Sequence, residues 1–460
     1  MPENFTPGGG LQETLIGPAG LILAALAILL IFILPRKYMI IPFLAGVVLI
    51  PRSQVFVVAG LHFMISRILI LLGGTIAIFG ALAGTPREWG WKFNPIDRAY
   101  ILCGVTGVVA YTILWGTGEA FLNRMGILIS TVGLYLVLRA LIRDWKDVDR
   151  ATTVLAVIMV VLAVCMLGEH VFGKNVFALF GGINEDPEVR KGHIRAQAAF
   201  AHPILAGTFG ATMFPLFFGL WWWGKRQKGL AIIGTAAAAI MVITSASSTP
   251  IGAVMGGLAG LGAWRFRHNM KRVRWWIVIG MILLQLKMHN PIWHVLVRFN
   301  ITEGSTGWHR YELIDQFIRH FKDWWLIGTR ENDTWGIDTW DSANQYVATG
   351  ISGGVVAFFF LILTIKRGFR AVGLARKKAE GDLMREGRIW MLGAVLLAQV
   401  AAFLGISYFD QTVVVWCLTL AMISAVCVNN ESRANDKQPV PGKEVSADAN
   451  AFTVIGARVV

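Results

Sequence analysis

The chain of 460 residues contains little charge and little cysteine. Charged residues make up only 15% of it, which is low for a soluble domain and argues against one. None of its four cysteines lies in a polar loop, so the sequence predicts neither a disulfide framework nor a zinc site. Residues 1–13 contain no lysine or arginine, and the apolar run that follows is long, so it is not expected to be a cleavable signal peptide.

Hydrophobic residues, by contrast, make up 55% of the chain. Apolar runs of ~17–25 residues can cross a bilayer as helices. We therefore predict an all-α polytopic membrane protein with about 12–13 transmembrane helices in one domain, residues 1–430, followed by a disordered cytoplasmic tail at 431–460. The span at 38–50 is short and 53–66 is an alternative segment along the membrane surface, so the count is open by one. The predicted spans lie near 14–34, 38–50, 67–84, 98–116, 121–142, 152–168, 203–223, 229–245, 249–264, 273–287, 346–365, 389–406 and 411–428.

The basic residues predict how the chain crosses the membrane. The net charge of +14 would suggest a nucleic-acid partner in a soluble protein, but here the basic residues collect in every second loop. Because lysine and arginine favour the cytoplasmic side, these loops are expected inside, and we expect no nucleic-acid partner. The polar stretches 169–202 and 288–345 then emerge together on the outer side, with the N-terminus outside and the C-terminus inside.

The longer outer stretch contains a predicted amphipathic helix with an arginine on its apolar face. At about 100° per residue, one face carries Leu313, Ile314, Phe317, Ile318, Phe321, Trp324 and Trp325. The other face carries Glu312, Asp315, Arg319, Lys322 and Asp323. Arg310 lies at the centre of the apolar face, where a charge must be paired or bind an anion. The alternative is that Arg310 bends from the helix start to a lipid headgroup or a neighbouring carboxylate.

The shorter outer stretch supplies further basic candidates. Arg190 and Arg195 precede His202-Pro203, which opens the next span. Arg195 could simply reach lipid phosphate, and a histidine beside proline at a helix start is as typical of a cap as of a base. Two arginines in separate outer loops instead suggest a clamp for a lipid-linked phosphate or diphosphate, because the planar guanidinium binds phosphate oxygens bidentately.

Two short patterns resemble one family. Arg195, Phe200, His202, Pro203 and Gly207 form R-x4-F-x-H-P-x3-G, and a helix opening with Arg310 precedes a glycine-rich run and then Asn344-Gln345-Tyr346. This order resembles the superfamily of O-antigen ligases and Wzy-type polysaccharide polymerases, over roughly residues 150–410. The resemblance implies a GT-C-like, metal-independent, inverting glycosyltransferase without cofactor in the bacterial inner membrane, its site facing the periplasm. It also implies that a polyprenyl-diphosphate-linked glycan is the donor and that the arginines hold the diphosphate.

The sequence departs from the family in two places. The ligases usually have a histidine, the suggested base, where this chain has Ala343, and often Ser-Arg-Gly where it has Ser-Ser-Thr-Pro at 247–250. Another group must then serve as base: His309, His320, Glu312 and Asp341 are candidates, although Glu312 points away from Arg310 on the helical wheel. This departure favours a polymerase over a ligase.

The resulting prediction is an enzyme that moves glycans between lipid-linked substrates. We expect Arg195, Arg310 and His309 to be catalytic, and His202, Arg190, Asn344, Tyr346 and Asp341 to bind substrate. No acidic pair of DxD type lies in the outer loops, so no metal site is predicted. The expected partners are the lipid-linked donor, a glycan or lipid-glycan acceptor, and membrane lipid. A ligase acting on a lipid A core, a transporter of lipid-linked oligosaccharide and a structural membrane subunit are the alternatives.

Overall fold

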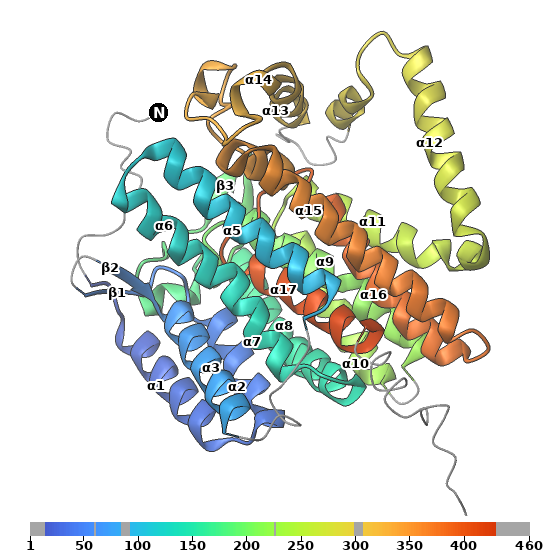
Figure 1. Ribbon diagram of the computed structural model, residues 1–460. Helices are drawn as coiled ribbons and strands as arrows, with labels where there is room; N and C mark the ends of the chain where they lie inside the picture. The colour runs from blue at the N-terminus through green and yellow to red at the C-terminus, as the bar shows by residue number, and fades with distance from the viewer. Residues whose placement is uncertain (1–13, 59–60, 84–92, 225–226, 299–306, 429–460) are drawn as a thin grey trace, which may run out of the picture.

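The structure is a computed structural model, which describes residues 14–58, 61–83, 93–224, 227–298 and 307–428. It is mostly helical (Figure 1). Among the described residues, six helical segments are long and apolar enough to cross a membrane: Ile65–Leu82, Pro95–Trp115, Gly118–Leu141, Trp145–Phe172, Pro203–Trp223 and Gln345–Lys378. Shorter apolar helices cover Pro18–Ile33, Lys228–Thr244 and Thr412–Val428. This is the content of a multi-pass membrane protein.

The elements follow one another as α1 (Pro18–Ile33), α2 (Arg36–Leu49), β1 (Val55–Val58), β2 (Leu61–Met64), α3 (Ile65–Leu82), α5 (Pro95–Trp115), α6 (Gly118–Leu128), η1 (Ile129–Gly133), α7 (Leu134–Leu141), α8 (Trp145–Phe172), η2 (Val176–Phe180), β3 (Glu188–Arg190) and β4 (His193–Arg195). The second half contains α9 (Pro203–Trp223), α10 (Lys228–Thr244), α11 (Ser248–Gly262), η3 (Ala263–Asn269), α12 (Met270–Lys287), η4 (Ile292–Arg298), α13 (Gly307–Arg319), α14 (Phe321–Trp324), η5 (Asn332–Thr334), α15 (Gln345–Lys378), α16 (Leu383–Ala402), α17 (Thr412–Ile423) and η6 (Ser424–Val428).

A helix lies at every predicted span, but only the six segments above are long and apolar enough to cross a membrane, so the count of about 12–13 transmembrane helices stays a prediction. The chain is also not purely helical. The segment predicted as an alternative surface element, 53–66, forms an antiparallel pair of strands, β1 and β2, in which Val55 pairs with Met64. Four successive valine and phenylalanine residues after Gln54 favour this extended conformation. A second antiparallel pair, β3 and β4, lies in the shorter of the two polar stretches predicted to be outside, 169–202. The predicted tail, 431–460, lies outside the described residues, and the orientation of the helices in a membrane stays a prediction.

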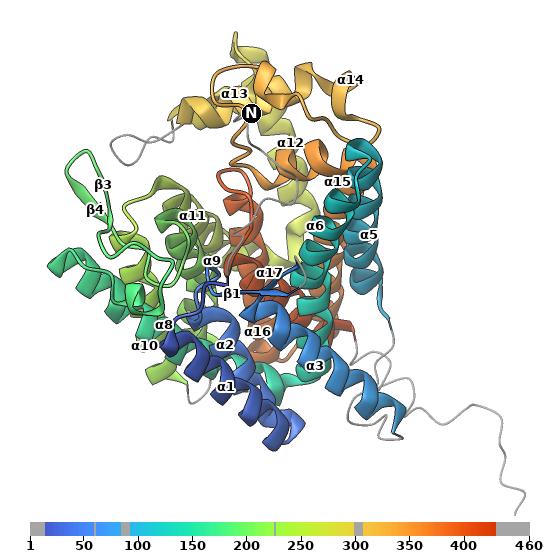
Figure 2. The same cartoon turned by 90° about the vertical axis from the view of Figure 1, so that its left-hand side faces the viewer.

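The helices form a bundle, and the two polar stretches predicted to be outside, 169–202 and 288–345, gather at one end of it. Figure 1 shows α13 and α14 at this end, beside the start of α15, while α12 stands apart with no buried residue. Figure 2 shows the β3–β4 hairpin and α13 on the same side of the bundle. Inside the bundle, glycines let helices approach closely: a Cβ on Gly210 of α9 would lie 2.8 Å from Met241 Cβ of α10.

A break in α15 attaches the outer segment to the bundle. Gly354 has φ 68°, a left-handed conformation that glycine adopts without steric cost. A side chain there would collide with the carbonyl of Leu326, which follows α14. Around the break, Val355 N donates to Trp325 O (2.8 Å) and Thr329 N donates to Ile351 O (2.9 Å). The chain after α14 is thus fixed against α15, and this holds α13 over the bundle.

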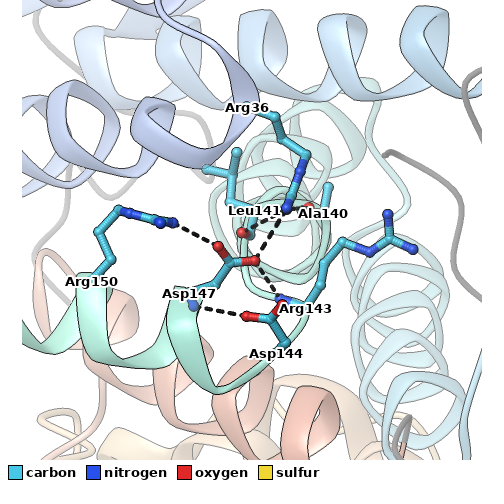
Figure 3. A network of polar contacts seen from close by, with 7 residues as sticks. All are labelled: Arg36, Ala140, Leu141, Arg143, Asp144, Asp147 and Arg150. Carbon is cyan, nitrogen blue, oxygen red and sulfur yellow. Dashed lines mark hydrogen bonds and ion pairs between the residues drawn. The ribbon is translucent and has the colours of Figure 1, made fainter. Parts of the chain in front are cut away.

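The opposite end of the bundle is held by an ion-pair network around Asp147 (Figure 3). Arg36 donates to Asp147 Oδ2 (3.3 Å), and Arg150 donates to Oδ1 (2.7 Å). Arg36 also donates to the carbonyl of Leu141 (3.0 Å), at the end of α7, while Asp144 caps α8 by accepting from Asp147 N (3.0 Å). The network joins α2, α7 and α8 through side chains of α2 and α8 and a backbone carbonyl of α7.

Candidate functional site

Arg310 lies on the buried side of α13, as predicted from the helical pattern. Its residue is 8% exposed. Its terminal nitrogens donate to Ser248 Oγ (3.2 Å) and Thr249 Oγ1 (2.7 Å), whereas its buried Nε has no hydrogen-bond partner. Burial and the nearby charge of Arg190 lower the pKa of Arg310 to about 10, so the guanidinium remains charged at neutral pH. This is a buried cation held by hydroxyls and not by a carboxylate.

The rest of this helix differs from the helical-wheel prediction in its length and in the burial of one polar residue. The helix ends at Arg319 and α14 begins at Phe321, so one continuous helix to Trp325 was wrong. Asp315 was placed on the polar face but is buried, because Trp293 of η4 covers it and donates to its carboxylate (3.2 Å). Arg319 is exposed and pairs with Asp315 (2.7 Å). Position 310 therefore differs from position 319 as predicted, although the polar face is partly covered.

Arg195 ends β4 and reaches the same turn as Arg310. Only 2% of it is exposed. It donates to Ser247 Oγ (2.7 Å) and to the carboxylate of Glu188 (2.5 Å), the residue opposite it in the β3–β4 pair. Arg195 and Arg310 therefore both bind side chains of residues 247–249, where α10 gives way to α11. Two predicted site arginines, more than one hundred positions apart, meet at one helix N-terminus.

The start of α11 adds to this positive field. The N-terminus of a helix carries unpaired N–H groups and a partial positive charge, which favours anions such as phosphate. Arg190, on β3, lies close enough to influence the charge of both Arg310 and His202. Among the negative groups, Glu188 binds Arg195, and Asp341 lies close enough to act on His202. Arg190, Arg195 and Arg310 thus form one basic cluster at this end of the bundle.

His202 is oriented by the start of α9. Its Nδ1 accepts a hydrogen bond from Ile204 N (3.1 Å), so it caps the helix. The proton of the neutral ring must then lie on Nε2, which faces Glu188 Oε2 at 3.5 Å. Burial lowers the pKa of His202, and Arg195 lowers it further, while Glu188 opposes them. Because its lone pair is engaged in the cap, His202 positions α9 and Glu188 and cannot take up a proton without losing that bond.

His309 has the opposite arrangement. Its Nε2 lies 3.2 Å from the carbonyl oxygen of Asp341, which can only accept, so Nε2 carries the proton and Nδ1 holds a lone pair. The same carbonyl accepts from Ala343 N (2.9 Å). The imidazole thus comes from α13, beside Arg310, and lies against the segment in which the family pattern has its histidine. Of the other candidates, His320 stacks on Trp335 (4.9 Å) and Glu312 faces the turn at Gly336.

Asn344 and Tyr346 have structural contacts. The Asn344 side chain accepts from Tyr346 N (2.9 Å) and Val347 N (3.2 Å) and donates to Leu404 O (3.2 Å), so it caps α15 and joins it to the loop after α16. The Tyr346 hydroxyl donates to Val400 O (3.1 Å). Both side chains hold α15 in place, and their polar groups are occupied without a substrate.

Sequence reasoning missed the partners of the arginines. Glu188, the hydroxyls of Ser247 and Thr249, and Gly405 all contribute, and a Cβ on Gly405 would lie 2.7 Å from Thr249 Oγ1 and 3.2 Å from Arg310 Nε. The only sequence signal was the Ser-Ser-Thr-Pro at 247–250, noted as a departure from the family pattern. Among the described residues, no group of three or more His, Cys, Asp and Glu is placed to hold a metal ion.

Comparison with models of known protein families gives no match, and no curated protein sequence matches the chain significantly. The family resemblance therefore stays a prediction.

Proposed function

We propose that the protein transfers glycan from a polyprenyl-diphosphate carrier to a sugar hydroxyl at the outer face of a bacterial inner membrane, with a GT-C-like fold. The observation that supports this most is the meeting of Arg195 and Arg310 at the N-terminus of α11. Arg310 has no carboxylate partner among the described residues, and its Nε–H is unused. A diphosphate supplies the oxygens that such a group of donors can bind.

The reaction is a single displacement. An acceptor hydroxyl oxygen attacks the anomeric carbon, the bond from that carbon to the diphosphate oxygen breaks, and the bonding electrons leave with the diphosphate. Arg195 and Arg310 stabilise the charge that develops there, and His309 accepts the hydroxyl proton on Nδ1. Attack from the side opposite the leaving group inverts the anomeric centre. No metal ion or other cofactor is needed when arginines and a helix N-terminus balance the charge.

A polymerase fits better than the alternatives. The arginines lie at one end of the bundle, whereas transporters of this size tend to hold their substrates near the middle of the membrane. In a polymerase both donor and acceptor are lipid-linked glycans, with membrane lipid around them. A ligase would use the same donor but a lipid A core as acceptor.

The test uses a strain from which the gene is deleted. If the protein is a polymerase, carrier-linked glycans in this strain stay as single repeat units, and the wild-type gene restores long chains. Long chains on the carrier in the deletion strain would refute the polymerase and identify a ligase. A normal pattern would refute both. Reporter fusions at Gly182 and Glu331 should both report export: the two arginines can meet only if both stretches lie on the same side, and the basic loops predict that this side is outside.

A further inference from the structure

A second group of arginines surrounds a cavity elsewhere in the bundle. The cavity has a volume of about 310 Å³. Its lining comes from α2 and the segment after it, β2, α3, α5, α6, η1, α7, α15, α17 and residues 407–411 of the loop between α16 and α17. None of the residues that bind Arg195 or Arg310 lines it. Ligand pockets typically measure about 300–1,000 Å³. The volume of the cavity is therefore large enough for the part of a lipid next to its headgroup, while the rest of the lipid chain would lie in the bilayer.

The cavity has apolar walls and three charged side chains in its lining. Val47, Ile70, Val108, Leu128 and Val414 supply the walls, Arg52 and Arg124 supply positive charge, and Asp410 supplies one carboxylate. Four of the lining hydroxyls bond within their own helices: those of Ser130, Thr131, Thr349 and Ser352 donate to the carbonyls of Gly126, Ile127, Gln345 and Ala348. The buried hydroxyl of Tyr408, which also lines the cavity, has no hydrogen-bond partner among the described residues.

The arginines have hydrogen-bonding capacity left. Arg52 Nε contacts Met64 Sδ (3.1 Å). Arg124 lies over the ring of Tyr111 (3.7 Å), and its buried Nε has no partner. Arg67 lies behind the lining and donates to Ser130 Oγ (3.0 Å). Within the described part of the chain, none of the three arginines forms an ion pair with a carboxylate. Two half-buried arginines and one carboxylate, that of Asp410, line the cavity, so its net charge is positive beside apolar walls, which suits an anionic amphiphile.

We propose that this cavity binds the acceptor as a polyprenyl-diphosphate-linked glycan, with its diphosphate at Arg52 and Arg124 and its first isoprenoid units against the apolar walls. The inference rests on the proposed polymerase function and specifies its second substrate. Charge complementarity selects the diphosphate, and the apolar walls select the lipid.

The position of the cavity relative to the first site supports this assignment. The loop between α16 and α17 borders both: Asp410 lines the cavity and accepts from Ala201 N (2.8 Å), next to His202. Earlier in the same loop, Gly405 O accepts a hydrogen bond from Thr249 Oγ1 (3.2 Å), and this hydroxyl in turn accepts one from Arg310. Two lipid diphosphates would thus lie on either side of one loop, and their sugars would meet near His309 at the outer end of the bundle.

The test fills the cavity without disturbing the first site. Gly107 lines the cavity, and a Cβ added there would have no atom within 4 Å. Gly107→Phe therefore places a ring in the cavity. Gly280→Phe is the matched control: a Cβ there is equally free, and it lies on α12, which has no buried residue. The probe is a polyprenyl diphosphate with a photoreactive diazirine in its isoprenoid chain, incorporated into phosphatidylethanolamine vesicles with the full-length protein.

The wild-type protein and Gly280→Phe are expected to be labelled in α5 and α6 as well as near α11. Gly107→Phe should lose only the label in α5 and α6. If Gly107→Phe does not fold, Arg52→Gln is used and should show the same selective loss. No label in α5 and α6 of the wild-type protein would overturn the proposal. Equal displacement of that label by phosphatidylglycerol would also overturn it, because the cavity would then hold ordinary phospholipid.

Glycan length in cells separates this proposal from the polymerase proposal. In the deletion strain, Gly107→Phe should leave single repeat units, whereas Gly280→Phe should restore long chains. If Gly107→Phe restores long chains and Arg310→Ala does not, the acceptor site is wrong and the polymerase function stands. If Arg310→Ala also restores long chains, the polymerase function itself fails.

Discussion

The arginines at the two ends of the bundle are held in different ways. At the end where α8 begins, Arg36 and Arg150 bind Asp147, and deeper in the bundle Arg139 pairs with Asp97 (3.0 Å) with both side chains fully buried. At the other end, Arg310 is held by two hydroxyls. A carboxylate neutralises a buried arginine and makes it part of the fold, whereas a hydroxyl orients it and leaves its charge for another partner.

Arg195 lies between these two cases. It binds a carboxylate, that of Glu188, but this carboxylate is 39% exposed and also faces His202. Arg195 also donates a hydrogen bond to the hydroxyl of Ser247. The comparison therefore predicts that substitutions at the carboxylate-paired end change stability, and that substitutions at the hydroxyl-held end change activity.

The largest effect on activity is expected for Arg310→Ala. Losing one preorganised donor to a developing anion costs about 10²–10³-fold in rate, so glycan extension should fall by this factor while the protein still folds. Arg310→Lys should also be impaired, because a point charge does not replace the bidentate fork. Chain extension is measured per amount of folded protein.

Arg319→Ala is the matched control, because it lies on the same helix but is exposed and forms only a surface ion pair. Near-normal extension is expected for it. Equal tolerance of alanine at both positions would remove the distinction between the two faces of α13.

Asp147→Asn should act on stability. Breaking a buried ion pair costs about 3–5 kcal/mol, and we expect about 3 kcal/mol, the lower end, because Arg36 and Arg150 are partly exposed. Thermal unfolding of the purified protein checks this, and extension per folded molecule should be unchanged. The control is Asp186→Asn, whose partner Lys174 is on the surface, so little change is expected. A loss of specific activity without a loss of stability would contradict the comparison.

Thr249→Val removes a hydroxyl that orients Arg310 while keeping the size of the side chain. A hydrogen bond to a charged group contributes about 1.5–3 kcal/mol, so extension should fall at least about tenfold. In an Arg310→Ala background the same substitution should have little further effect, because the two residues act together. Additive losses would mean that Thr249 acts independently of Arg310.

The smallest effect concerns His202 and pH. Because burial and Arg195 lower its pKa, the folded protein binds this proton less readily than the unfolded chain does. Stability from His202 is therefore present above its ordinary pKa of about 6.5 and is lost as the pH falls below it. His202→Asn keeps a capping side chain and should reduce the loss of thermal stability between neutral pH and pH 5. An unchanged pH dependence would show that other groups cause it.

The sequence predicted the helices and Arg310 well because both follow from local periodicity. Apolar runs give the spans, and the 100° pattern places Arg310 on the buried side of α13. Asp315 was misplaced because its burial depends on Trp293 of η4, which no helical wheel includes.

Long-range contacts account for the rest. The hydroxyls of residues 247–249 accept hydrogen bonds from arginines of two distant loops. The sequence alone therefore could not identify this run of hydroxyl residues as part of the site. The cavity at Arg52 and Arg124 combines residues from helices, a strand and loops that lie far apart in the sequence, and no local pattern predicts it.

The most direct test of the central claim is chain extension by the purified protein. It would be reconstituted in vesicles with lipid-linked repeat units isolated from the deletion strain, and the length of the carrier-linked glycan would be followed. The wild-type protein and Arg319→Ala should extend single units into chains, whereas Arg310→Ala and Arg195→Ala should leave them as single units. Extension by the two site variants at the wild-type rate would contradict a diphosphate site built from Arg195 and Arg310.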